Sequence, residues 1–173
     1  MDKDFLKDIQ ETLSLFKAIG VIEDYRIVRS GYDEKGREYF IGEIRLHRNI
    51  EFLIEMIVDD WFNYALTNPE YYREDLERLA KCVKNEYEVF REKTDGDLLD
   101  LIVCAILLEA VVCVVAIVQG VDIRRVWGDE SISKLASALW CSYRNNEMFK
   151  ELYEYWRAKA EELRLVLKSM KLL

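Results

Sequence analysis

The chain has 173 residues, of which 51% are hydrophobic and 34% are charged, and its net charge is −8. This length and composition suit one domain with its own apolar core, and they exclude a disordered tail or a small disulfide-stapled scaffold. An acidic chain has no general attraction to phosphate groups, so we expect no direct binding to nucleic acid.

The cysteines and the opening residues indicate a reduced, cytoplasmic protein. Four cysteines show no CxxC pair, and a single histidine leaves no zinc-ligand spacing. The first stretch, MDKDFLKDIQ, is charged and amphipathic, which is unlike a secretory signal. Glutamine and threonine are scarce beside abundant Glu, Lys and Arg, a bias reported for proteins of hyperthermophiles.

The N-terminal part predicts one helix followed by a β-hairpin. Apolar residues recur at helical spacing over residues 2–19, with Asp2 as the expected N-cap and Gly20 at the end; they are Phe5, Ile9, Leu13 and Phe16. Two β-rich runs joined by a polar loop with glycines then predict a hairpin over residues 21–46. An isolated hairpin is marginally stable, so we expect it to pack on the helices or to pair with another chain.

The rest of the chain predicts helices. Asn49 is the expected cap of a helix to about Leu66, and Asn68 with Pro69 is expected to start another, which ends near Lys93. Further helices are expected at about 98–119, 131–143 and 147–173. With one proline and no flexible linker, we expect a single, mostly α domain over residues 1–173.

The most unusual stretch is Leu101–Val118, in which Glu109 is the one residue among eighteen that is not apolar. Its length and hydropathy also suit a membrane span, and its β-branched residues from Val111 onward also suit a buried strand. The other helices are amphipathic and need a surface to cover, which favours a helix through the centre of the domain. Glu109 would then reach a basic or hydroxyl partner, or else stand in a cleft as a functional acid.

Two pairs of acids are candidate metal ligands. Glu51 and Glu55 lie one helical turn apart with Asp59 beyond them, in an otherwise apolar helix, while Asp97 and Asp100 open the central helix. Carboxylates gathered in this way bind hard cations such as Mg²⁺ together with phosphate oxygens. The alternative is structural, because acids in a first helical turn suit the helix dipole and Asp97 is a typical cap.

These two acid pairs, with an apolar helix that runs into GVDIRRV, resemble the all-α nucleotide pyrophosphatases of the MazG and dimeric dUTPase type. The resemblance implies a Mg²⁺-dependent phosphohydrolase whose carboxylates come from two helices. This chain departs from the family spacing, because Glu51 and Glu55 have three residues between them where the family has two. A whole additional helix also separates Glu55 from Asp97.

The last helix has the clearest periodicity. Apolar residues alternate at spacings of four and three from Phe149 to Leu173, with one polar member; the candidate partner-binding residues on this seam are Leu152, Trp156, Lys159, Leu163, Val166 and Met170. Such a seam packs either within its own domain or against another chain.

The sequence thus leads to two functional hypotheses. We favour a protein that acts through protein–protein association, as a homodimer or as a subunit of a larger assembly, with no membrane partner and no cofactor. The alternative is the Mg²⁺-dependent phosphohydrolase, with Mg²⁺ held by Glu51, Glu55, Asp97 and Asp100.

Overall fold

The fold is mostly helical, as predicted. The structure, a computed structural model, describes residues 3–173, without the side chains of residues 3–6, 8 and 38–41. Seven α-helices, one 3-10 helix and one two-stranded sheet are found in this part of the chain. In chain order they are α1 (Lys3–Ala18), β1 (Ile22–Tyr32), β2 (Glu38–Leu46), α2 (Arg48–Thr67), α3 (Arg73–Lys93), α4 (Leu98–Gln119), α5 (Ile123–Val126), α6 (Glu130–Asn145), η1 (Glu147–Phe149) and α7 (Lys150–Ser169).

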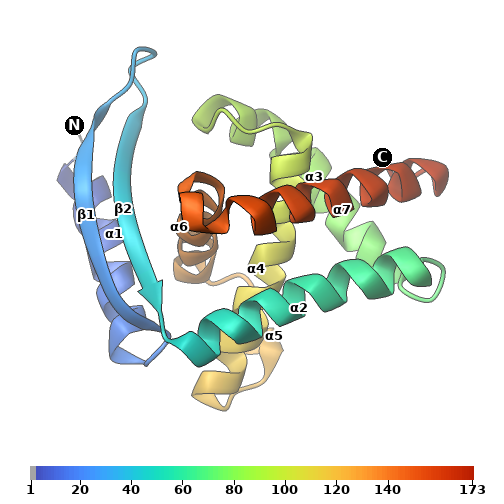
Figure 1. Cartoon of the computed structure of the whole chain (residues 1–173), viewed down its shortest axis with the longest axis horizontal. Helices are drawn as coiled ribbons and strands as arrows, with labels where there is room; N and C mark the ends of the chain where they lie inside the picture. The colour runs from blue at the N-terminus through green and yellow to red at the C-terminus, as the bar shows by residue number, and fades with distance from the viewer. Residues whose placement is uncertain (1–2) are drawn as a thin grey trace.

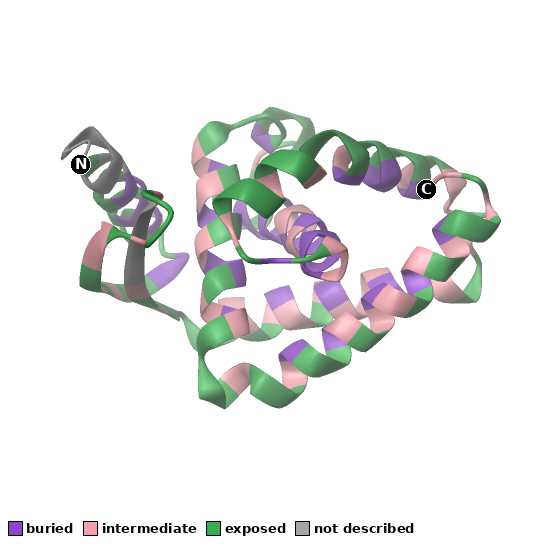
Figure 2. Cartoon of the chain, turned by 90° about the horizontal axis from the view of Figure 1, so that it is seen from above, coloured by how far each residue is buried: buried purple, intermediate pink, exposed green. Residues whose placement is uncertain are grey.

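The centre of the domain is α4, which confirms the predicted central helix. Buried residues lie on all sides of it, and helices α2, α3, α6 and α7 pack around it (Figure 1). Figure 2, which looks roughly along α4, shows its buried residues in the middle of the other helices. The segment from Val111 is helical rather than a strand. At its C-terminal end Gly120 adopts φ 66°, a left-handed conformation that costs glycine little.

The same helix meets the length and composition of a membrane span. Its most apolar window of 18 residues has a mean hydropathy of 3.2, and 72% of that window is buried inside the protein. A core helix of this kind and a membrane span share these two properties, so the packing of the other helices around α4 is the more informative observation.

The predicted hairpin is present and lies beside the helices together with α1 (Figure 1). One face of α1 is buried through Ile9, Leu13 and Phe16, and the helix packs on β1 and α6. The tip of the hairpin is attached to the α3–α4 connection, because Arg37 donates to the Glu92 carbonyl at 2.9 Å and to Asp95 at 3.2 Å. The predicted cap Asp2 and the side chain of Phe5 lie outside the described residues.

Two predicted helix starts were wrong. Helix α2 begins at Arg48 with exposed His47 in the capping position, so Asn49 lies inside the first turn and does not cap the helix. Helix α3 begins at Arg73, after a turn that contains Pro69. Asn68 closes α2 instead of starting α3, because its backbone N–H donates to the Tyr64 carbonyl.

The predicted heptad seam of α7 is only partly buried inside this chain, because the buried residues of the helix are Tyr153, Trp156, Ala160, Leu163 and Leu167. Trp156 and Leu163 are fully buried, and α7 packs on α2, α4 and α6. The other predicted partner-binding residues of the seam are partly exposed; these are Leu152, Lys159, Val166 and Met170. Lys159 lies 3.5 Å from Glu162 and over the ring of Tyr155, so its charge interacts with residues of its own helix.

We expect Leu163→Ala to lower the free energy of unfolding by about 2–5 kcal/mol, because truncating a fully buried leucine removes apolar contacts and leaves a cavity. The matched control is Leu165→Ala on the same helix, where the side chain is 52% exposed; we expect a change within about 0.5 kcal/mol. Urea denaturation of both variants is the measurement. Equal losses would contradict the inward orientation of Leu163.

Candidate functional site

The acids at the start of α4 form a helix cap. The Asp97 carboxylate accepts a hydrogen bond from the backbone N–H of Asp100 at 2.9 Å, and the Asp100 carboxylate accepts one from the N–H of Asp97 at 3.0 Å. This reciprocal arrangement satisfies two of the N–H groups that a helix start leaves unpaired. It is the structural alternative that the sequence left open for Asp97.

Arg157 of α7 binds both of these carboxylates. Its Nη1 lies 2.8 Å from Asp97 Oδ1 and 2.8 Å from Asp100 Oδ1, and its Nη2 lies 2.8 Å from Asp97 Oδ2. The guanidinium of Arg157 holds the pKa of Asp97 well below its usual range. Asp97 is therefore ionised at neutral pH and paired, which makes it unsuitable as a general base.

Asp100 is only 3% exposed, and its remaining contacts extend into the core. The Tyr153 hydroxyl donates to Asp100 Oδ1 at 2.5 Å, and the Trp140 indole N–H donates to the Tyr153 oxygen at 2.8 Å. Burial raises the pKa of Tyr153, and its hydrogen bond to Asp100 raises it further. Arg144 stacks over the Trp140 ring at 5.1 Å and lies 3.8 Å from Asp100 Oδ2. The buried carboxylate is thus hydrogen-bonded and neutralised, as a buried charge requires.

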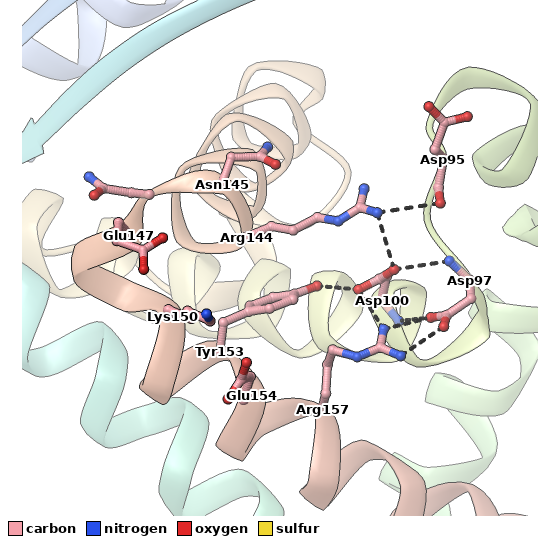
Figure 3. Close-up of a pocket in the computed structure, with 11 residues that line it drawn as sticks. Asp95, Asp97, Asp100, Arg144, Asn145, Glu147, Lys150, Tyr153, Glu154 and Arg157 are labelled. Atoms are coloured by element: carbon pink, nitrogen blue, oxygen red, sulfur yellow. Dashed lines mark hydrogen bonds and ion pairs between the residues drawn. The ribbon is translucent and has the colours of Figure 1, made fainter.

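This network forms the floor of a surface pocket of about 470 Å³ between the start of α4, the end of α6 and the start of α7 (Figure 3). The rim carries charges of both signs; the rim residues are Asp95, Asn145, Asn146, Glu147, Lys150 and Glu154. The carboxylates and guanidiniums at the floor already bind one another. These ion pairs connect α4 to α7.

Glu51, Glu55 and Asp59 lie on α2, and the last two accept hydrogen bonds from tyrosines. The Tyr143 hydroxyl donates to Glu55 at 3.3 Å, and the Tyr155 hydroxyl donates to Asp59 at 3.2 Å. Burial raises the pKa of Glu55, and the nearby charge of Glu51 raises it further. Within the described residues, the structure gathers no group of three or more His, Cys, Asp or Glu side chains that could hold a metal ion. The two predicted acid pairs therefore do not meet in one Mg²⁺ site of that kind.

Glu109 has the basic partner that the sequence suggested. The Trp61 indole N–H donates to it at 2.6 Å, and Arg78 of α3 donates at 2.9 Å. The Arg78 guanidinium also lies 5.5 Å from the centre of the Trp127 ring. These contacts join α2, α3, α4 and the residue that follows α5, so Glu109 and Arg78 together connect four parts of the chain.

A surface on α2 is the feature that the sequence reasoning missed. Phe52 is 66% exposed and Met56, one turn further on, is 42% exposed, while Leu53 and Ile57 beside them are partly exposed. The opposite side of α2 is buried in the core through Ile54, Val58, Phe62 and Ala65. The available signal was that α2 is apolar nearly all round its first half, although only one side of it can face α4.

Comparison with known proteins finds no matching family, no similar curated protein and no similar solved structure. Proposals about function therefore depend on the contacts and surfaces of this chain alone.

We expect Arg157→Met to lower the free energy of unfolding by about 2–4 kcal/mol, because it leaves the buried Asp100 carboxylate without its closest charge partner. The value lies below that of a fully buried pair because the Arg157 side chain is 32% exposed. The control is Arg164→Met on the same helix, whose partner Glu161 is 43% exposed, and it should change stability little. Urea titration that shows similar losses for both would contradict the role given to Arg157.

Glu55→Gln should melt at a higher temperature than the wild type at pH 7. A carboxyl whose pKa is raised in the folded chain loses stability as pH rises from its ordinary value of 4.5 toward the folded pKa. Glutamine avoids this loss, so the difference should disappear below pH 4.5, where both side chains are neutral. Melting curves across this pH range test the direction of the effect. The control is Glu154→Gln, at an exposed position of α7. A Glu55→Gln difference independent of pH would contradict it.

Proposed function

We propose that this protein acts through protein–protein association in the cytoplasm, and that its contact surface includes the exposed side of α2. We call this the α2 surface and define it by Phe52, Leu53, Met56, Ile57 and the adjoining Asp60. The observation that carries the proposal is the exposure of Phe52 and Met56, at 66% and 42%, on one stripe of a helix whose opposite side is core.

Exposure of neighbouring large apolar side chains has a free-energy cost of about 25 cal/mol for each Å² left in water. Single exposed apolar residues are common, but contiguous ones mark surfaces where another molecule binds. Because α2 already provides four buried residues to the core, folding alone does not require apolar side chains on its outer side. Burial in a complex supplies a reason for them.

The charges around the α2 surface favour a protein as the partner. Glu51, Glu55 and Asp59 border it on one side and Asp60 adjoins it. These acids would be repelled by the phosphates of nucleic acid and by anionic lipid headgroups. Apolar and aromatic side chains within a polar rim are typical of the centre of a protein–protein interface.

The association surface that we propose lies on α2 and not on the predicted seam of α7. Trp156 and Leu163 already contact other helices of their own chain and have no exposed surface for a partner. The partly exposed members of the seam, such as Leu152 and Val166, could contribute only at an edge of an interface.

We expect the double variant Phe52→Ser, Met56→Ser to lose association while it keeps its helical content. Sedimentation velocity should show wild-type species heavier than the 20.6 kDa chain, and a photoreactive residue at position 52 should cross-link to a protein partner in cells. The control is Leu165→Ser, which removes an equally apolar, 52% exposed residue from α7. A wild type that remains at 20.6 kDa and forms no cross-link through position 52 would contradict the proposal.

A further inference from the structure

A second apolar surface lies where α4 ends and α5 begins. Ile117 is 63% exposed, Val118 is 37% exposed, and Ile123 and Trp127 are each 38% exposed. Arg124 and Arg125 stand among them on α5 and are exposed as well. We call this surface the α4–α5 corner. Its two arginines are notable in a chain whose net charge is −8.

The α4–α5 corner and the α2 surface both stand on elements that contact α4. Helices α2 and α5 both pack against α4, and in Figure 1 the corner is drawn just below the first half of α2. A series of contacts from Trp61, the residue after Asp60 on α2, through Glu109 and Arg78 reaches Trp127 of the corner. The two surfaces can therefore belong to one interface.

The charges beside the two surfaces are opposite in sign, and some of them are unpaired. In the described part of the chain, the side chains of Asp60 and Glu51 on α2 and of Arg125 on α5 have no hydrogen-bond or ion-pair partner. Arg124 pairs only with Asp122, two residues before it. An acidic border beside one apolar surface and a basic border beside the other are complementary, which favours and orients association of one surface with the other.

We propose that the partner is a second copy of this chain, related by a two-fold axis that passes between the two surfaces. The α2 surface of each copy then packs on the α4–α5 corner of the other. This inference rests on the proposed function, and it adds the identity of the partner and the pairing of the surfaces.

A two-fold interface is self-complementary, because a residue of one copy that contacts a second residue of the other is matched by the reverse contact. Such an arrangement covers both apolar surfaces of both copies in a single contact. It also places Asp60 of each copy near Arg125 of the other, where each unpaired charge finds the opposite sign. A contact of α2 with α2 would leave the corner exposed and would bring two acidic borders together.

The test uses two charge-reversed chains, Asp60→Lys and Arg125→Glu, studied separately and mixed. Alone, each variant brings like charges together at both halves of the interface, so its dimer dissociation constant should rise at least about tenfold at low salt. In the mixture, a heterodimer pairs Lys with Glu at one half and the native Asp with Arg at the other. Mixing should therefore restore a species of two 20.6 kDa chains, 41.2 kDa in total, with nearly wild-type affinity.

Analytical ultracentrifugation measures these constants, and raising the salt should reduce the differences between variants. The control mixture is Asp60→Lys with Lys168→Glu, which makes the same charge change as Arg125→Glu at an exposed position of α7. The Lys168→Glu chain keeps both interface charges, so it should dimerise with itself and should not draw the Asp60→Lys chain into dimers. Dimers that both single variants leave intact, or that mixing fails to restore, would overturn the reciprocal pairing. A wild type that is monomeric but cross-links to another protein through position 52 would overturn the self-partner while the proposed function stands.

Discussion

A helix that is apolar on every side has to be covered on every side, and α4 imposes this requirement on the whole chain. Helices α2, α3, α6 and α7 all pack against it, so most of the core consists of their inner faces and α4 itself. Burial of this apolar surface is the main favourable free-energy term available to a domain of this size. The hairpin and α1 then attach at the side, through α6 and through Arg37 at the hairpin tip.

The two acids of α4 show how the chain places charge in such a helix. Asp100, at the start, is held by Arg157 and Tyr153, while Glu109, in the middle, is held by Arg78 and Trp61. In both cases an arginine from a neighbouring helix neutralises the carboxylate, so the interaction that removes the cost of burial also connects two helices. A candidate metal ligand and a candidate functional acid of the sequence thus join α4 to α7 and to α3.

Some apolar side chains stay exposed after the other helices have covered α4. We propose that these side chains serve the function of the protein. Helix α2 contributes one apolar side to the core and keeps a second one, around Phe52 and Met56, in solvent. The end of α4 likewise passes beyond the helices that cover it and exposes Ile117 and Val118. Polar side chains at these positions would leave the core unchanged, so folding does not explain the apolar ones. Binding of another molecule to them does.

Local chemistry allowed much of the fold to be predicted from the sequence: the apolarity of residues 101–118, the Asp97 cap, the glycine at 120 and the alternation in the hairpin each act within a few residues. The starts of α2 and α3 were mispredicted because a helix start also depends on how the chain leaves the preceding element, as at His47 and Asn68. The site depended on longer-range contacts still. Arg157 contacts Asp97 and Asp100 across 60 and 57 residues of sequence, and no local pattern predicts that pairing.

The sequence by itself determined which helices have apolar faces. Only the tertiary structure decided which faces meet inside the chain and which are left for a partner, because helical periodicity is set by neighbouring residues whereas burial is set by every element that packs around α4.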